Sequence, residues 1–353
     1  MKTKLFLVLL AIGITGSAGC SDDEEKSVSV SSITLDKNSL DLKIGETAVL
    51  TATVSPENAT DKTIVWTSSD SSVAAVDETG TVTAVAAGNT TVTAAVKGGK
   101  SAVCEVAVSP GEPVVGDYYY SDGTYSAELD AAKKVIGVVF WVGDPTVSDA
   151  ALKREHPGCT HGLVVALDEV VTPWQYNWDV WGEDKLVGDW IAENTTDYAS
   201  ITTKTSLKDN MNKIIGYNNT KGIELFNADP ANGEWKVEAV EEVVKYRNNE
   251  ARKAPANTSD WYFPSLKELS LLCSGEYDDT IWSITNDTDM RDAIAAILAT
   301  IPDATGFNNA GYWSSSEYAA SSPYYLSIRD GAGYNDLRKS YSTNLAVRCV
   351  LAF

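Results

Sequence analysis

Residues 49–54 read VLTATV, a run in which apolar and polar side chains alternate. An alternation with a period of two is typical of a β-strand that buries one face. The pattern recurs in further short runs at residues 33–35, 40–42, 82–85 and 91–94. Turn-forming residues separate the runs: Gly45, Pro56, Gly80, Gly88 and the pair Gly98-Gly99. Many short strands between such turns predict an all-β sandwich.

Segments of this region resemble the bacterial immunoglobulin-like group 2 domain: residues 44–47 (IGET), 50–56 (LTATVSP), 65–70 (VWTSSD), 76–77 (VD) and 80–84 (GTVTA). The resemblance covers residues 28–110. It implies a spacer or adhesion module without catalytic residues. Trp66 and Cys104 are then expected in the core of the sandwich.

The chain begins with a segment that resembles a lipoprotein signal. Apolar residues 5–14 follow two lysines, and as a helix they extend only about 15 Å, too short for a bilayer core of about 30 Å. Residues 1–19 are therefore interpreted as a cleavable signal peptide. Residues 17–20 (SAGC) resemble a lipobox, which implies lipidation of Cys20 and a membrane anchor through that lipid.

An acidic tether, residues 20–27, follows the lipidation signal. Its run SDDEE resembles the export signal of lipoproteins that face outward from the outer membrane. This resemblance implies an outer-membrane protein exposed to the cell exterior. The alternative is a solvated tether without a targeting role, because runs of like charge usually stay disordered.

Charge and composition narrow the function classes. The chain has 353 residues, with 28 basic and 49 acidic side chains and a formal net charge of −21. A phosphate backbone would repel so acidic a chain, so no nucleic-acid partner is expected. The 10 tryptophans and 16 tyrosines can fill a large core and also supply a binding surface.

A short linker, residues 111–116, is expected to separate the sandwich from a second domain, residues 117–353. Strands are predicted at residues 118–125, 134–142 and 162–167. Ser206 is expected to cap a helix over residues 207–215 that buries Met211 and Ile214. Three further apolar stripes each predict a helix. The first buries Val237, Val240 and Val244, and the second buries Leu266, Leu269 and Leu272 or Cys273. The third buries Ile294, Ile297 and Ile301.

Three motifs of the second domain resemble the C-type-lectin-like fold of bacterial surface lipoproteins: residues 261–269 (WYFPSLKEL), 311–318 (GYWSSSEY) and 347–350 (VRCV). Formylglycine-generating enzymes and retroelement-diversified phage tropism determinants share that fold. The resemblance implies a rigid core whose C-terminal loops present a variable binding face. The overall expectation is an all-β immunoglobulin-like sandwich followed by an α+β C-type-lectin-like domain.

The candidate ligand-binding residues lie between the second and third motifs, over residues 319–346. They are Tyr324, Tyr325, Arg329, Asp330, Tyr334, Asn335, Asp336, Arg338, Tyr341 and Asn344. Tyrosine, asparagine, aspartate and arginine supply contact area and adaptable hydrogen bonds, as in antibody paratopes. The alternative is a solvated loop whose tyrosines are partly buried in the core.

The catalytic and metal sites of these relatives do not carry over. Calcium-dependent lectins chelate the ion with Glu-Pro-Asn or Gln-Pro-Asp and Trp-Asn-Asp, and the chain contains none of these tripeptides. Formylglycine-generating enzymes use a reactive cysteine pair in a specific context that Cys273 and Cys349 lack. A disulfide or buried thiols are the expected alternative. The residues therefore indicate no catalytic set, no metal and no cofactor.

Two other clusters have both a functional and a structural interpretation. His156, Cys159 and His161 could bind zinc together with a further ligand, but a turn before the strand at 162–167 is favoured. The aromatic residues Trp174, Tyr176, Trp178, Trp181 and Trp190 could stack on sugars, but burial is favoured because large exposed apolar patches are uncommon. The cysteines Cys104, Cys159, Cys273 and Cys349 allow three disulfide pairings or remain buried thiols.

The sequence thus predicts a lipid-anchored surface protein without enzymatic activity. The leading hypothesis is an adhesin that recognises a host or microbial surface protein or a glycan with its C-terminal loops. A structural or tip subunit of a surface appendage is the alternative. An enzyme of the formylglycine-generating type or a glycan hydrolase is the least favoured hypothesis, because no complete catalytic set is visible.

Overall fold

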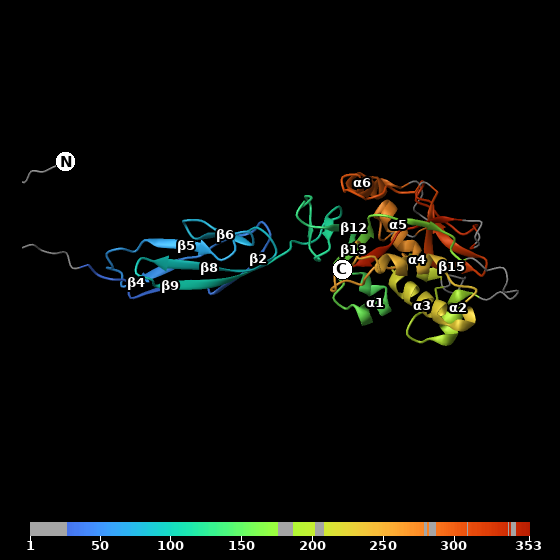
Figure 1. Ribbon diagram of the computed structural model, residues 1–353, viewed down its shortest axis with the longest axis horizontal. Helices are drawn as coiled ribbons and strands as arrows, with labels where there is room; N and C mark the ends of the chain where they lie inside the picture. The colour runs from blue at the N-terminus through green and yellow to red at the C-terminus, as the bar shows by residue number, and fades with distance from the viewer. Residues whose placement is uncertain are drawn as a thin grey trace, which may run out of the picture. The chain divides into compact units, whose positions relative to one another are not determined.

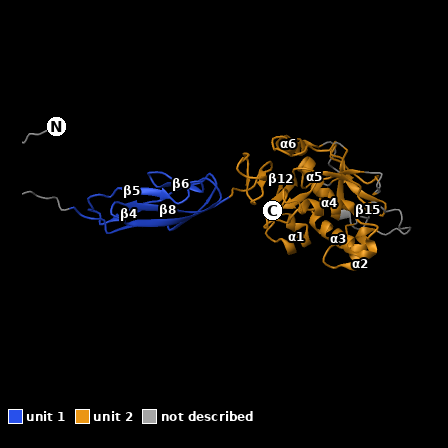
Figure 2. Ribbon diagram, in the orientation of Figure 1, with its two compact units in different colours: residues 1–109 blue, residues 110–353 orange. Residues whose placement is uncertain are grey.

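The computed structural model describes residues 27–175, 186–201, 208–278, 281, 287–308, 310–337, 339 and 344–353. Within them the chain divides into two compact units, residues 1–109 and 110–353 (Figure 2). The signal segment, Cys20 and most of the acidic tether lie outside the described residues. No helix in the described part of the chain is long and apolar enough to cross a membrane.

The first unit is a β-sandwich, as the alternating runs predict. Its strands are β1 (Ser32–Leu35), β2 (Ser39–Lys43), β3 (Thr47–Val49), β4 (Ala52–Ser55), β5 (Ile64–Ser68), β6 (Ala74–Val76), β7 (Thr81–Ala84), β8 (Gly88–Val96) and β9 (Ser101–Ser109). They form a four-stranded sheet β2-β9-β8-β5, a three-stranded sheet β3-β7-β6 and the pair β1-β4. The strand β2 runs parallel to β9, and the long hairpin β8-β9 is antiparallel.

The core of the sandwich is made by the apolar positions of the alternating strands. Val82, Val92 and Cys104 are fully buried in one cluster, so the expected core position of Cys104 is confirmed. The half-buried Trp66 packs against this cluster and also against the one around Ile33. Gly80, in the turn before β7, has a φ of +83° and lies directly against the Trp66 ring and the Leu50 carbonyl.

The second unit contains two five-stranded sheets. The first has the order β11-β10-β12-β13-β19, with β10 (Tyr118–Tyr120), β11 (Tyr125–Ser126), β12 (Val135–Val142), β13 (Gly162–Ala166) and β19 (Val350–Ala352). The second has the order β14-β18-β15-β16-β17, with β14 (Val170–Thr172), β15 (Tyr312–Ala319), β16 (Ser322–Leu326), β17 (Gly333–Tyr334) and β18 (Leu345–Val347). Figure 1 shows the red C-terminal segment beside the green strands β12 and β13, where β19 pairs with β13.

Helices pack around and between these sheets. They are α1 (Ala150–Glu155), α2 (Val187–Asn194), α3 (Gly216–Ala228), α4 (Glu238–Arg247), α5 (Leu266–Ser274) and α6 (Asp289–Leu298), with short 3-10 turns at Pro145–Val147, Lys208–Asn212 and Pro230–Asn232. Helices form at the three predicted stripes, and Val240, Leu269 and Ile294 are fully buried. Two other members of the stripes, Val244 and Ile297, are only partly buried. A capping box begins α5, in which Ser265 and Glu268 bond each other's backbone N–H groups.

The helix predicted over residues 207–215 is wrong. The structure has a 3-10 turn at Lys208–Asn212, and the α-helix α3 begins only at Gly216. Met211 and Ile214 are nevertheless buried as expected, while Ser206 lies outside the described residues. A Cβ on Gly216 would lie 2.2 Å from a carboxylate oxygen of Glu268, so the helix start needs glycine at this close approach.

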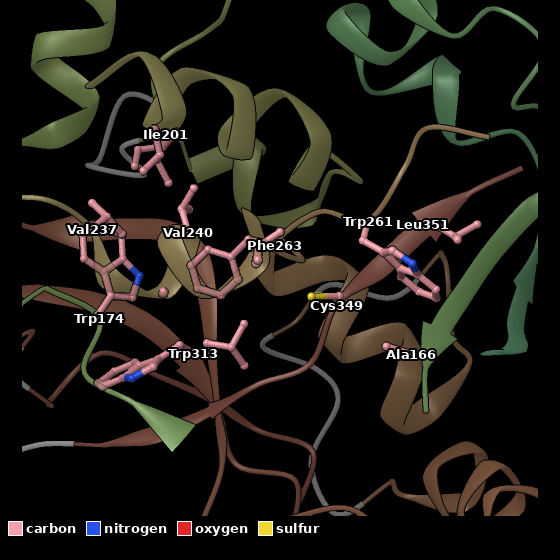
Figure 3. Packing of buried hydrophobic residues seen from close by; sticks show 14 of the residues in the cluster. Ala166, Trp174, Ile201, Val237, Val240, Trp261, Phe263, Trp313, Cys349 and Leu351 are labelled. Atoms are coloured by element: carbon pink, nitrogen blue, oxygen red, sulfur yellow. The ribbon is translucent and has the colours of Figure 1, made fainter. Parts of the chain in front are cut away.

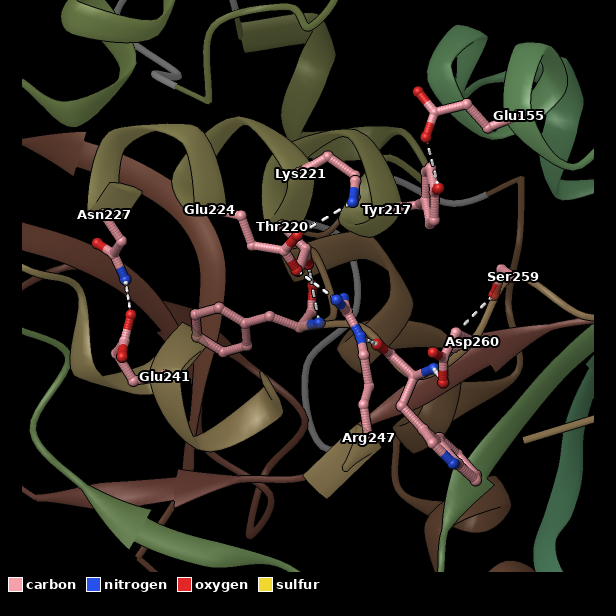
Figure 4. Close-up of polar contacts among 12 residues, drawn as sticks. Glu155, Tyr217, Thr220, Lys221, Glu224, Asn227, Glu241, Arg247, Ser259 and Asp260 are labelled. Atoms are coloured by element: carbon pink, nitrogen blue, oxygen red, sulfur yellow. Dashed lines mark hydrogen bonds and ion pairs between the residues drawn. The ribbon is translucent and has the colours of Figure 1, made fainter. Parts of the chain in front are cut away.

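Polar side chains connect α3 to its neighbours (Figure 4). The Tyr217 hydroxyl donates to Glu155 of α1 at 2.7 Å. The guanidinium of Arg247, on α4, donates to Glu224 and to the carbonyl of Trp261. Asn227 donates to Glu241 at 3.0 Å. These bonds tie α3 to α1, α4 and the segment before α5.

The largest apolar cluster contains residues of both sheets and of the helices (Figure 3). Trp174 and Trp313 are fully buried in it, and each indole N–H donates to a backbone carbonyl at 2.9 Å. Trp261 and Leu351 also belong to this cluster. Many of the aromatic side chains of the second unit thus lie in its core.

A buried ion pair joins the second sheet to the segment that precedes β18. Lys339 and Glu317 have side-chain exposures of 1% and 0%, and the ammonium group contacts the carboxylate. The Lys339 nitrogen lies 4.5 Å from the centre of the Trp174 ring. Burial lowers the pKa of Lys339, while the negative charge of Glu317 opposes this shift. The Glu317 carboxylate also accepts from the backbone N–H groups of Val187 and Gly188, at 3.2 and 2.9 Å.

A second buried cation lies between the two sheets. Arg348 separates β18 from β19 and is 1% exposed. Its guanidinium donates to the carbonyls of Leu167 and Thr305, at 3.0 and 2.6 Å, and lies 4.6 Å from the centre of the Phe307 ring. Glu169 is the nearest carboxylate, at 3.6 Å. Arg348 therefore fixes the loop that carries Phe307.

Replacing Gly80 tests the packing of the sandwich. An added Cβ would lie 2.5 Å from the Leu50 carbonyl oxygen and 2.7 Å from the Trp66 ring. Gly45 is a matched control, because its φ is +86° and nothing lies within 4 Å of its Cβ position. We expect Gly45→Ala to cost about 1 kcal/mol of unfolding free energy and Gly80→Ala about 2 kcal/mol more, measured by chemical denaturation. Equal losses for both variants would contradict the steric argument.

Removing the Lys339 charge tests the buried pair. Lys339→Met leaves Glu317 buried without its counter-ion, so we expect the second unit to lose about 3–5 kcal/mol of unfolding free energy. Lys245→Met is the control, because Lys245 pairs with Glu242 on the surface and should cost less than about 1 kcal/mol. Glu317→Gln in the Lys339→Met background should restore part of the loss. Similar losses in both single variants, in denaturant titrations, would show that the buried pair has no special role.

Candidate functional site

The candidate stretch, residues 319–346, contains buried and exposed parts. Tyr324 and Tyr325 are only 3% and 9% exposed. The Tyr324 ring belongs to the cluster of Leu266 and Leu269, and the Tyr325 ring makes an edge contact with Trp313. The expectation that these two tyrosines present a surface is therefore wrong. The reason is that the two faces of β16 pack on different apolar clusters, so Tyr324 is covered on one face and Tyr325 on the other.

Other predicted residues of the stretch are accessible. Tyr334 is 39% exposed, Arg329, Asp336 and Asn344 are exposed, and Asp330 and Asn335 are partly exposed. Arg338 and Tyr341 lie outside the described residues. The structure thus brings Asp330, Tyr334, Asn335 and Asp336 together around β17, and we call these four residues the β17 surface.

Hydrogen bonds order the β17 surface. The Tyr334 hydroxyl donates to Asp330 at 3.0 Å, and the Tyr325 hydroxyl donates to Asp336 at 2.8 Å. The rings of Tyr325 and Tyr334 stack with centroids 5.5 Å apart. Burial acts to raise the pKa of Asp330, but hydrogen bonds from the Ala332 N–H and from the Ser327 and Tyr334 hydroxyls hold it below its ordinary value. Asp330 is therefore an anion with its acceptors already engaged.

An open pocket lies beside this stretch. It is lined by Arg291, Asp292 and Ala295 of α6, by Phe307, and by Ile328 and Arg329 after β16, and its volume is about 530 Å³. Arg291 donates to the Ile328 carbonyl at 2.6 Å and pairs with Asp292 at 2.6 Å. Of these lining residues the sequence pointed only to Arg329. Ile328 is its direct neighbour, and the others come from two distant segments, α6 and the loop of Phe307, which no local pattern marks.

The three residues of the histidine loop contact different neighbours. The His156 ring contacts the Tyr217 hydroxyl at 3.1 Å, and burial lowers the pKa of His156. The His161 ring stacks on Phe353. Cys159 is buried, with its sulfur 3.8 Å from the Asn257 carbonyl. Among the described residues, no group of three or more histidine, cysteine or acidic side chains could hold a metal ion.

The cysteines of the two units are buried free thiols: Cys104, Cys159, Cys273 and Cys349. Burial raises the pKa of Cys159 and of Cys273 to about 12, so neither is a reactive thiolate near neutral pH. The sequence left disulfide pairing and buried thiols as alternatives, and the structure shows buried thiols.

Two members of the aromatic run lie among the described residues. Trp174 is fully buried, and Trp190 is partly buried with its ring against Phe226. Tyr176, Trp178 and Trp181 lie outside the described residues. The favoured interpretation, burial, therefore holds for Trp174.

Comparison with known proteins identifies the first unit. Residues 29–106 match the family described as bacterial Ig-like domain (group 2), which confirms the resemblance given by the sequence motifs. A 93-residue part of the chain is also 46% identical to a lacto-N-biosidase of Bifidobacterium bifidum, over 26% of this chain and 8% of that protein. So short a match with so long a protein carries no activity over to this chain.

A larger part of the chain is similar to two proteins of Bacteroides ovatus. It is 28% identical over 244 residues to a Bacteroides ovatus protein named "Putative fimbrium tip subunit Fim1C". The matched stretch makes up 62% of this chain and 41% of that relative. The chain also superposes on the crystal structure of a fimbrial protein from Bacteroides ovatus, with a TM-score of 0.55 and 19% sequence identity. The superposition covers 92% of this chain and 71% of the fimbrial protein chain. At that identity the likeness is one of fold. The chain spans less than half the length of the curated relatives described here.

Proposed function

We propose that this protein is a subunit of a fimbria-like appendage on a bacterial surface, with residues 110–353 as its distal head. One observation carries the proposal. The fold likeness to a fimbrial protein extends over 92% of the chain, so it is not limited to the widespread immunoglobulin-like unit. The similarity to a fimbrium tip subunit supports the same conclusion. The appendage hypothesis, the alternative on sequence grounds, is therefore preferred to a stand-alone adhesin.

The head is proposed to have the C-type-lectin-like fold. The positions of the three sequence motifs support this assignment. Residues 261–269 lead into α5 through its capping box, and residues 311–318 form most of β15. Residues 347–350 connect β18 in the second sheet to β19 in the first. The terminal strand thereby returns to the sheet in which the head begins.

Recognition by the head is the second candidate function. The accessible β17 surface favours it, because tyrosine, aspartate and asparagine side chains suit adaptable contacts. The partner would be a host or microbial surface protein or a glycan. The net charge of −21 disfavours nucleic acid. The proposal includes no catalysis and no cofactor.

Shearing cells tests the appendage proposal. We expect the full-length protein to be released with filaments and to sediment with them, and immunogold labelling with antibodies to the head should decorate filaments. Protein that remains evenly distributed on cells, while filaments shear away without it, would contradict the proposal and favour the stand-alone adhesin.

Cys20→Ser tests the proposed lipid anchor. Because lipidation requires the thiol, the variant should move from the membrane fraction to the soluble fraction. The conservative Cys104→Ser variant is the control, since Cys104 is buried in the sandwich and should leave fractionation unchanged. External protease on intact cells should digest the wild-type protein, and neutralising the acids at 22–25 should protect it. Wild-type protein that resists the protease in intact cells would contradict surface display.

A further inference from the structure

The pocket beside α6 has chemistry that neither the comparisons nor the appendage proposal uses. Its lining contains three charged side chains, Arg291, Asp292 and Arg329, and three apolar ones, Ala295, Phe307 and Ile328. The volume of about 530 Å³ lies within the range of small-molecule sites, about 300–1,000 Å³. A mixed lining of this kind suits a ligand with a polar edge and an apolar face.

The two arginines of the pocket differ in what they contact. Arg291 is engaged, because its guanidinium bonds the carbonyl of Ile328 and the carboxylate of Asp292. Arg329 is exposed, and its guanidinium has no ion-pair or hydrogen-bond partner in the part of the chain that the structure describes. Its neighbour Asp330 already accepts from Tyr334 and Ala332. One arginine fork thus remains open at the pocket in a chain with a net charge of −21.

Phe307 supplies an oriented aromatic wall. The guanidinium of the buried Arg348 lies 4.6 Å from the centre of its ring, and the Tyr312 ring makes an edge contact at 6.2 Å. These contacts fix the ring before any ligand binds, so less conformational entropy is lost on binding. Ala295 and Ile328 extend the apolar surface of the pocket.

We propose that this pocket binds a sugar that carries a carboxylate, with the carboxylate on Arg329 and an apolar face of the sugar ring against Phe307. Arginine matches a carboxylate with two parallel N–H···O bonds, which gives both affinity and orientation. A sugar ring has the apolar face and the polar edge that the lining requires. Uronic acids and sialic acids share this chemistry. The inference does not depend on the appendage proposal, because it concerns a pocket within the head.

Two matched pairs of ligands test the proposal on the full-length protein. Methyl β-glucuronide and methyl β-glucoside differ only in the carboxylate, and sialyllactose and lactose differ only in the sialic acid. We expect one or both acidic members to bind at least about tenfold more tightly than the neutral partner, because a charge-assisted hydrogen bond replaces a neutral one. Saturation-transfer NMR and calorimetry at millimolar ligand measure this difference. A difference in the first pair identifies a uronic acid as the ligand type, and a difference in the second pair identifies a sialic acid.

Variants assign the binding to the pocket. Arg329→Gln should remove the preference for the acidic ligand, and Arg329→Lys should retain part of it because the charge remains without the fork. Ala295→Trp should block both members of a pair by filling the pocket. Lys153→Gln removes an equal charge from an exposed position of α1 and should change nothing. Circular dichroism checks that each variant is folded.

The opposite results are equally clear. Equal affinity for the acidic and neutral ligands would overturn the role of Arg329, and unchanged binding by Ala295→Trp would move the site elsewhere. The absence of binding by every ligand at millimolar concentration would overturn the proposal as a whole. None of these outcomes affects the shearing test, which depends on assembly and not on a sugar.

Discussion

The Glu317–Lys339 ion pair is the interaction on which much of the head depends. Transfer of two charges out of water costs several kcal/mol per ion, and only good geometry with further hydrogen bonds offsets that cost. Here the Glu317 carboxylate is also bonded by the first N–H groups of α2, and Trp174 lies beside the ammonium group. The pair therefore links β15, α2, Trp174 and the segment before β18. An arrangement that keeps one of these charges buried without the other is strongly disfavoured.

A second constraint comes from the end of the chain. Residues 345–347 belong to one sheet of the head and residues 350–352 to the other, with Arg348 and Cys349 between them. Both short strands are fully buried, so this segment belongs to the core of each sheet. Arg348 then orders the Phe307 loop through its carbonyl bonds. The pocket at α6 is thus held by a side chain that does not line it.

The sequence predicted the elements whose periodicity is simple. Strict alternation identified the sandwich, and apolar stripes identified α4, α5 and α6. The helix α3 was missed because it buries Asn218, Asn219 and Thr220, whose side chains are satisfied by hydrogen bonds and interrupt an apolar stripe. Tyr324 and Tyr325 were assigned to a surface because composition does not distinguish an inner strand from a loop. The pocket could not be predicted, since its lining comes from three segments that only the tertiary fold brings together.

The four buried thiols have a consequence for the conditions under which the protein works. The cores of both units are complete without a covalent cross-link, and each thiol is enclosed by apolar neighbours. Stability therefore comes from packing, hydrogen bonds and buried ion pairs, none of which responds to a thiol reductant. A thiol reductant therefore finds no cross-link between these four cysteines that it could break.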